Sequence, residues 1–204
     1  MADHDESPGD RTIATYEAGV ERYRSHLPDE VPAPVRAFLE EVAECVGPGS
    51  RVLELGSGPG REAAYLETRG VNVTRSDATA AFVAMMRRDG HDARLLDVRR
   101  DELGTGWDAV LADAMLLHLT REEFRSVVAK ARRAVRDGGL LAITLKEGDR
   151  EGWSTAKLDA PRWFTYWREA PLRQTLEDAG WRVRSVDHVP GRVDEWLYVI
   201  ARTA

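Results

Sequence analysis

The sequence predicts an α/β protein with a doubly wound, seven-stranded sheet that is mostly parallel and ends in an antiparallel hairpin. Three observations support this fold class. Short apolar segments alternate with segments of helical periodicity between residues 51 and 145. A glycine-rich turn follows the first apolar segment. The last two predicted strands, 181–189 and 195–201, are too close in sequence for a crossover helix, so they are expected to pair antiparallel.

Two helices are predicted before the sheet. Residues 1–12 are polar and acidic, and we expect a disordered tail there. The spacing of apolar residues predicts helices over 13–27 and 35–46, and Gly47 ends the second of them. No linker or repeat divides the rest, so we expect residues 13–204 to form a single domain.

The alternating elements follow in order. Strands are predicted over 51–55, 71–75, 93–96, 109–112 and 140–145. Helices are predicted over 59–69, 79–88, 121–136 and 169–179. Residues 147–167 are expected to form a long loop that is rich in aromatic side chains.

The composition of the 204 residues limits the functional class. With 29 basic and 35 acidic residues the net charge is −6, which disfavours a nucleic-acid partner. The single cysteine, Cys45, rules out an internal disulfide and any site with several thiolate ligands. No apolar run has the roughly 20 residues of a membrane span, and the first residues lack the pattern of a signal peptide. We expect a cytoplasmic protein with no membrane partner.

The turn after the first strand reads Glu54-Leu55-Gly56-Ser57-Gly58-Pro59-Gly60. Ligands of open α/β sheets bind beyond the carboxyl ends of the strands, beside this first strand. A dinucleotide site needs the spacing G-x-G-x-x-G, whereas this turn has G-x-G-x-G followed by Arg61. The acidic Glu54 also suits a cationic ligand better than a phosphate. The turn therefore disfavours a pyrophosphate ligand.

An acidic residue follows each of the next three strands: Asp77, Asp97 and Asp113. A carboxylate at Asp77 could accept both ribose hydroxyls of an adenosine group, and it could equally cap the helix that follows. Asp97 stands in a charged stretch and could instead be an ordinary loop residue. His118, five residues after Asp113, is a candidate general base or a buried histidine that supports its loop.

The strand order, the E-x-G-x-G-x-G turn and these acidic residues resemble the class I S-adenosylmethionine-dependent methyltransferases, with their Rossmann-like fold, over residues 35–202. The resemblance implies S-adenosylmethionine as cofactor and S-adenosylhomocysteine as product. It implies that a helix carrying two spaced tyrosines lies as a lid over the cofactor, although tyrosines at this helical spacing could equally pack on the body of the protein. The cofactor-binding residues that it implies are Tyr16, Tyr23, Glu54, Gly56, Ser57, Gly58, Gly60, Asp77, Ala78, Asp97, Val98, Asp113 and Ala114.

The resemblance also assigns these residues to parts of the cofactor. Glu54 would lie at the amino-acid end, and the turn glycines with Ser57 would contact the methionine and ribose. Asp97 and the Val98 amide would meet the adenine ring. Asp113 would stand where methyl donor and acceptor meet. His118 is the candidate catalytic residue.

Residues after the fifth strand suggest where the acceptor binds. The Lys146-Glu147-Gly148 segment and the aromatic stretch 163–167 resemble a bacterial subgroup of small-molecule methyltransferases. The aromatic side chains would suit a flat, hydrophobic or cationic acceptor, or they would simply cover the edge of the sheet. We expect methyl transfer to oxygen or nitrogen of a small molecule, by a monomer or homodimer without a metal.

Two alternatives stay open. The predicted helix 121–136 carries six basic residues, which could contact the phosphates of an RNA acceptor or be an ordinary solvated face. An RNA or protein methyltransferase is therefore the first alternative. A nucleoside-cofactor-binding protein without catalysis is the second, and turnover separates it from an enzyme. An NAD-type oxidoreductase is disfavoured by the glycine spacing.

Overall fold

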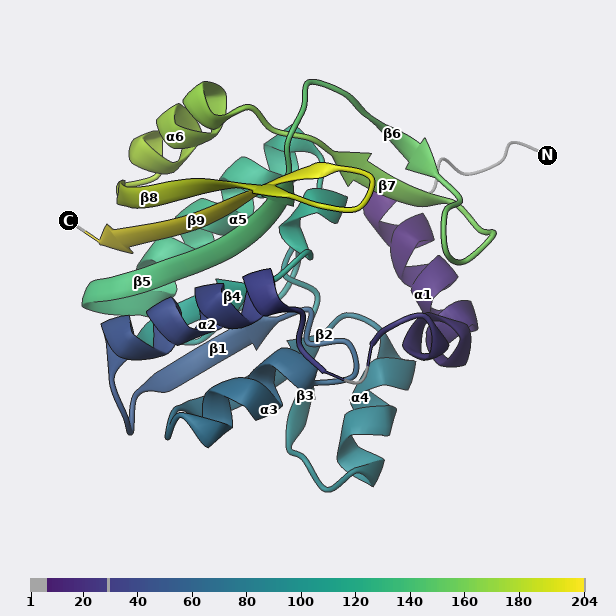
Figure 1. Ribbon diagram of the computed structural model, residues 1–204, viewed down its shortest axis with the longest axis horizontal. Helices are drawn as coiled ribbons and strands as arrows, with labels where there is room; N and C mark the ends of the chain where they lie inside the picture. Colours follow the sequence, from purple (N-terminus) through teal and green to yellow (C-terminus); the bar gives the residue numbers. More distant parts are fainter. Residues whose placement is uncertain (1–6, 29, 204) are drawn as a thin grey trace.

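The computed structural model describes residues 7–28 and 30–203. Its centre is a seven-stranded sheet in the order β3-β2-β1-β4-β5-β9-β8 (Figure 1). Only β9 runs against its neighbours, because it pairs antiparallel with both β5 and β8. The strands are β1 (Arg51–Leu55), β2 (Asn72–Asp77), β3 (Ala93–Leu95), β4 (Trp107–Ala112), β5 (Val135–Lys146), β8 (Trp181–Pro190) and β9 (Glu195–Thr203). The predicted sheet, with its C-terminal hairpin, is confirmed.

Alternating side chains along the central strands fill two separate cores. On β1, Val52 faces one core, whereas Leu53 and Leu55 face the other. The first core is closed by α2 (Ala33–Val46) and α3 (Arg61–Thr68), and the second by α5 (Arg121–Ala134) and α6 (Glu169–Asp178). α4 (Ala80–Arg88) packs on β2 and β3. A strand buried on both faces must be apolar throughout, which explains the continuous apolar runs of the sequence.

The N-terminal helix α1 (Pro8–Ser25) begins earlier than predicted. The expected disordered tail is wrong for residues 8–12, and residues 1–6 lie outside the described residues. Ser7 caps the helix by accepting a hydrogen bond from the Asp10 amide, and Pro8 occupies its first turn. Asp10 also forms an ion pair with Arg99, 89 residues further along the chain, at 2.6 Å. The acidic composition of residues 1–12 alone could not reveal this distant partner.

The predicted aromatic loop contains a second, two-stranded sheet. β6 (Glu151–Ser154) pairs antiparallel with β7 (Arg162–Thr165), and α1 packs against β7 (Figure 1). A short 3-10 helix, η1 (Leu116–His118), lies under β7 and also contacts α1. The β6–β7 hairpin and α1 therefore cover the carboxyl end of β4.

Within the described ranges, no helix is both long and apolar enough to cross a bilayer.

Thr12 links α1 to the β6–β7 hairpin through hydrogen bonds. Its hydroxyl donates to the Pro8 carbonyl and accepts from the Trp163 amide at 2.9 Å, and the side chain is buried. We expect Thr12→Val to leave the Trp163 N–H buried without a partner, at a cost of about 1–3 kcal/mol. Hydrogen exchange of the α1 amides should speed up accordingly. Thr175→Val is the matched control, because the Thr175 hydroxyl makes the same bond to a carbonyl four residues earlier on α6. Equal exchange in the two variants would contradict this role.

Candidate functional site

The turn between β1 and α3 has three glycines in the left-handed region, and their surroundings differ. A Cβ on Gly56 would lie 2.2 Å from Met115 Cγ, so packing excludes any larger residue there. A Cβ on Gly60 would crowd Arg75 at 3.2 Å. Gly58 has no atom within 4 Å of that position, so it borders open space. Of the three, Gly58 therefore leaves the most space for the close approach of a ligand.

A cavity lies above this turn, between α1, α4 and the loops after β2, β3 and β4; we call it the first cavity. Apolar side chains, Ile13, Phe82 and Leu119 among them, form much of its wall. Eleven residues predicted from the sequence line it: Tyr16, Tyr23, Gly56, Gly58, Asp77, Ala78, Asp97, Val98, Asp113, Ala114 and His118. The loops at the carboxyl ends of the strands therefore bring most of the predicted site together.

Glu54, Ser57 and Gly60 do not line the first cavity. Ser57 lines a neighbouring cavity, and Gly60 packs under the turn. Glu54 is 2 % exposed, and its Oε2 has no hydrogen-bond partner among the described residues. Burial raises the pKa of Glu54 to about 8, with the nearby Glu62 charge adding to the rise. A buried carboxyl with an unused acceptor atom is suited to a cationic or hydrogen-bond-donating ligand.

Asp77 joins two turns of the cavity floor. Its Oδ2 accepts from the Gly58 amide at 2.9 Å, and its Oδ1 accepts from the Thr79 amide at 2.8 Å. Burial raises the pKa of Asp77, and the two amide bonds oppose that rise. A carboxylate oxygen can accept more than one hydrogen bond, and Asp77 lines the first cavity. The carboxylate therefore supports the turn and can still accept a diol.

Asp97 makes more hydrogen bonds within the protein than the sequence suggested. Its carboxylate accepts from the Arg99 amide and guanidinium, and Arg99 also holds Asp10 of α1. Burial would raise the pKa of Asp97, but the bonds to Arg99 outweigh it and the pKa lies below its ordinary value. Arg99 itself lines the first cavity and was not predicted. In this structure, Asp97 connects the cavity rim to α1 through Arg99.

Asp113 stands between the first cavity and its neighbour and lines both. The Thr144 hydroxyl of β5 donates to its Oδ1 and accepts from the Ala114 amide. Burial raises the pKa of Asp113 to about 6, Glu62 raises it further, and the Thr144 bond opposes this. Ala114 has φ 49°, an uncommon conformation outside glycine, which turns the chain sharply between the two cavities. Thr144 was not predicted, because nothing in the sequence pairs it with Asp113.

His118 lies between Tyr16 of α1 and Trp163 of β7. Its Nδ1 is 2.6 Å from the Trp163 carbonyl oxygen, which can only accept, so Nδ1 must carry the proton. Its Nε2 is then the acceptor for the Tyr16 hydroxyl at 2.9 Å. Burial lowers the pKa of His118 to about 3, so the ring is neutral near pH 7. Arg162 of β7 donates to the same Tyr16 oxygen at 2.9 Å.

The second cavity has a volume of about 430 Å³ and opens on the other side of Asp113 and Gly58. Residues from α1, α3, the loop after β6 and the β8–β9 turn line it, with the side chains Arg61, Lys157, Arg192, Trp196 and Tyr198 among them. The two cavities share Tyr23, Gly56, Gly58, Asp113 and Ala114. This size is within the range of small-molecule sites.

The aromatic stretch 163–167 lines neither cavity. Phe164 and Trp167 belong to the second core, and Trp163 packs edge-on against Trp153. Basic residues of the chain cover several rings: Lys146 lies 4.4 Å from the Phe164 ring centre, and Arg121 lies 4.5 Å from that of Trp167.

Within residues 7–28 and 30–203, no three His, Cys, Asp or Glu side chains are grouped to hold a metal ion.

The raised pKa of Glu54 predicts a pH-dependent stability. The pKa rises from 4.5 to about 8 on folding, so the stabilising contribution of the protonated carboxyl is complete below about pH 4.5 and is lost as pH rises toward 8. We expect ligand-free protein to lose about 2–4 kcal/mol relative to Glu54→Gln between pH 5 and pH 8. Denaturant unfolding at both pH values measures this. Glu44→Gln, on the exposed side of α2, should follow the wild type. Parallel curves for wild type and Glu54→Gln would contradict the assignment.

Comparisons with known proteins agree with this geometry. A family model described as a methyltransferase domain matches residues 53–143. The DhpI structure in complex with S-adenosylhomocysteine is 26 % identical, with a TM-score of 0.77 over 99 % of this chain and 98 % of that one. Among proteins with curated functions, none matches the chain at a significant level.

Two further structures share the fold at lower identity. The 1,6-didemethyltoxoflavin-N1-methyltransferase of Burkholderia thailandensis is 20 % identical, with a TM-score of 0.78 over 100 % of this chain and 91 % of that one. The magnesium protoporphyrin IX methyltransferase of Synechocystis PCC 6803 is 16 % identical, with a TM-score of 0.78 over 100 % of both chains. The domain match over residues 53–143, together with the shared fold, indicates a methyltransferase that uses S-adenosylmethionine.

Proposed function

We propose that the chain transfers a methyl group from S-adenosylmethionine to a small-molecule acceptor. The observation that carries this proposal is the second cavity, which meets the first at Asp113, Ala114 and Gly58. Its roughly 430 Å³ suits a metabolite. The Burkholderia and Synechocystis enzymes are named for small-molecule acceptors, which is consistent with this assignment.

The residues of the first cavity fit the cofactor. The Asp77 oxygens can accept the ribose hydroxyls, and the apolar wall with Phe82 and Leu119 suits the adenine ring. Glu54, beneath the turn, can accept from the ammonium of the methionine end through its unused Oε2. When bound, the cofactor supplies an electrophilic methyl group on a positively charged sulfur.

The chain contributes mainly by positioning. Holding acceptor and donor in line removes most of the entropic barrier of a two-reactant step. Asp113 lies where the two cavities meet, and its Thr144 bond fixes its orientation. α1 closes the first cavity from above and excludes water.

His118 and Tyr16 form a unit that positions α1 over the first cavity. Because Nδ1 donates to the Trp163 carbonyl, Nε2 accepts from the Tyr16 hydroxyl. Burial keeps the His118 ring neutral by lowering its pKa, and burial raises the pKa of Tyr16, so the phenol keeps its proton near pH 7. The Arg162 guanidinium donates to the same phenol oxygen. In this arrangement His118 acts through Tyr16.

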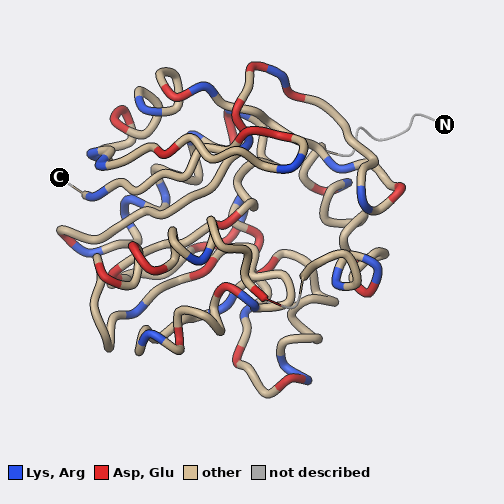
Figure 2. Tube along the Cα trace, viewed as in Figure 1, with Lys and Arg blue, Asp and Glu red and all other residues tan. Residues whose placement is uncertain are grey.

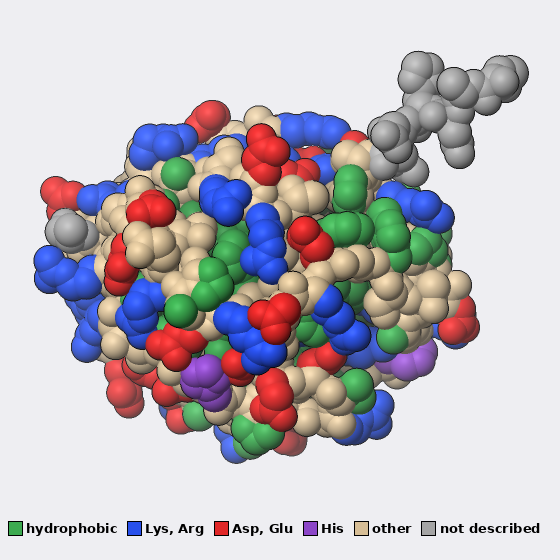
Figure 3. Space-filling model, turned by 90° about the horizontal axis from the view of Figure 1, so that it is seen from above, with side chains coloured by type: hydrophobic (Ala, Val, Ile, Leu, Met, Phe, Trp, Pro, Cys, Tyr) green, Lys and Arg blue, Asp and Glu red, His purple; other side chains and the backbone are tan. Residues whose placement is uncertain are grey.

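An RNA or protein acceptor is less well supported. Three basic side chains of α5 bond to other parts of the protein: Lys130 donates to two carbonyls, Arg132 to the Gly180 carbonyl, and Arg121 to the Tyr166 carbonyl. Acidic and basic residues alternate along the chain and over the face shown from above (Figures 2 and 3). An extended phosphate chain needs a continuous basic surface instead.

The first experiment is calorimetric titration with S-adenosylmethionine, S-adenosylhomocysteine and NAD. We expect the first two to bind and NAD not to bind. Release of S-adenosylhomocysteine is then assayed over panels of small metabolites, tRNA and peptides. Turnover confined to RNA or peptides would overturn the proposal. Binding without turnover on any panel would favour a non-catalytic cofactor-binding protein.

Asp77→Ala should weaken S-adenosylhomocysteine binding by about 1–3 kcal/mol, because the ribose hydroxyls lose a buried acceptor. Calorimetry measures the change. Asp108→Ala is the matched control, because the Asp108 carboxylate likewise accepts from a backbone amide, that of Arg51, at the opposite end of the sheet. The control should lose stability and keep its affinity. Equal affinities in both variants would place the ribose elsewhere.

His118→Ala should loosen α1 over the first cavity and reduce kcat on the acceptor found in the screen by about tenfold, because the two reactants are then held less well in line, while cofactor affinity changes much less. Tyr16→Phe, which keeps the ring and removes the hydroxyl, should reproduce that loss. The double variant should then be no slower than either single one, because both residues act in one unit. Additive losses would show that the two residues act separately.

A further inference from the structure

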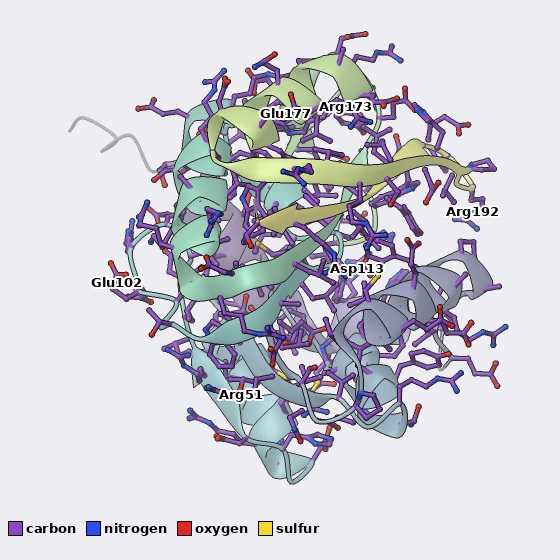
Figure 4. The ribbon with its side chains drawn as sticks, turned by 90° about the vertical axis from the view of Figure 1, so that its left-hand side faces the viewer. Arg51, Glu102, Asp113, Arg173, Glu177 and Arg192 are labelled. Atoms are coloured by element: carbon purple, nitrogen blue, oxygen red, sulfur yellow. The ribbon has the colours of Figure 1, made fainter. Side chains whose placement is uncertain are left out.

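Two of the basic side chains that line the second cavity lack acidic partners, and the lining also contains the acidic residues Glu62 and Asp113. Lys157, in the loop between β6 and β7, and Arg192, in the β8–β9 turn, both line it. Neither has a carboxylate within 4.0 Å among residues 7–28 and 30–203. Arg61, the third basic lining residue, is paired with Glu62. Figure 4 shows Arg192 on the turn near the surface and Asp113 in the interior of the molecule.

Several basic side chains act on Lys157. Partial burial lowers its pKa, and Arg162, Lys146, Arg192 and Arg61 lower it further. Lys146 and Arg61 are paired with Asp194 and Glu62, whereas Arg162 and Arg192 have no carboxylate within 4.0 Å among the described residues. Like charges gathered without a counterion destabilise one another, and an anion placed between them removes that cost.

Arg162 adds a fixed charge beneath this region. It is 3 % exposed, and its guanidinium donates to the Tyr16 hydroxyl and the Ala156 carbonyl. Its Nε has no partner, and no described carboxylate lies within ion-pair distance. A buried guanidinium without a counter-charge is costly. No described carboxylate compensates the positive charge of Arg162 near Lys157.

The aromatic stretch 163–167 does not offer a cation site. Lys146 covers the faces of Phe164 and Tyr166, and Arg162 covers Phe164 as well. These rings line neither cavity, and the chain already covers them with its own cations. The sequence-based expectation of a cationic acceptor held by aromatic rings is therefore not favoured by this arrangement.

We propose that the methyl acceptor is an anion whose acidic group, a carboxylate or a phosphate-type oxyanion, is bound by Lys157 and Arg192 at the mouth of the second cavity. This inference rests on the proposed function, because it names the substrate class of the same site. The two exposed side chains hold the acidic end, and the rest of the molecule extends inward to Asp113, where the methyl-accepting atom meets the first cavity. Lysine and arginine both bind such groups through charge-assisted hydrogen bonds.

The test measures anion binding to protein saturated with S-adenosylhomocysteine. Inorganic phosphate and acetate are titrated separately, at constant ionic strength maintained with chloride. We expect at least one of the two to bind below about 50 mM, and Lys157→Gln and Arg192→Gln each to weaken that binding about tenfold, as expected for loss of one charged hydrogen bond. Tighter binding of phosphate assigns a phosphate-type group, and equal or tighter binding of acetate assigns a carboxylate.

Arg182→Gln is the matched control, because Arg182 is exposed on β8 and lines neither cavity. It should keep the wild-type anion affinity, and all three variants should keep the wild-type affinity for S-adenosylhomocysteine. Failure of both anions to bind, or equal binding in wild type, Lys157→Gln and Arg192→Gln, would overturn the inference. Failure of S-adenosylhomocysteine itself to bind would instead overturn the cofactor assignment on which the proposed function depends.

Discussion

The carboxylate of Asp77 holds the two turns on which the site depends. It accepts one backbone amide from the glycine turn after β1 and one from the start of α4. Parallel pairing of β1 with β2 brings these turns together, because both strands end at the same edge of the sheet. A buried carboxylate tolerates this position only if its oxygens are hydrogen-bonded, and here the backbone supplies the bonds. The floor of the first cavity is therefore fixed before any ligand binds.

The two cavities have opposite electrostatic character. The floor beneath the first contains Glu54, Asp77 and Asp113, and burial raises the pKa of each. The mouth of the second carries Lys157 and Arg192, close to the buried Arg162. A cationic ligand in the first cavity would relieve the cost of ionising the acids, and an anionic ligand in the second would relieve repulsion among the bases. The charges that destabilise the empty protein are thus those that would select its ligands.

Features that depend on neighbouring residues could be predicted from the sequence, and features that depend on distant ones could not. The strand order, the glycine turn and the acidic residues at strand ends are local patterns, and they led to most of the lining of the first cavity. Arg99, Thr144 and Arg162 were missed, because their partners Asp10, Asp113 and Tyr16 lie 31 to 146 residues away. The aromatic stretch could be predicted only as acceptor-binding or as a cover for the edge of the sheet, and the pairing of β6 with β7 turns several of its rings into the core.

α1 connects both cavities, which gives it a part in the order of binding. Tyr16 reaches His118 and Arg162, Thr12 holds the hairpin, and Asp10 holds Arg99 at the rim of the first cavity. Entry of a cofactor beneath this helix requires some of these contacts to open. The same hairpin positions Lys157 for the acceptor, so displacement of α1 would disturb the basic mouth of the second cavity as well. Cofactor binding followed by closure of α1 would therefore complete the acceptor site, which favours an order in which the cofactor binds first.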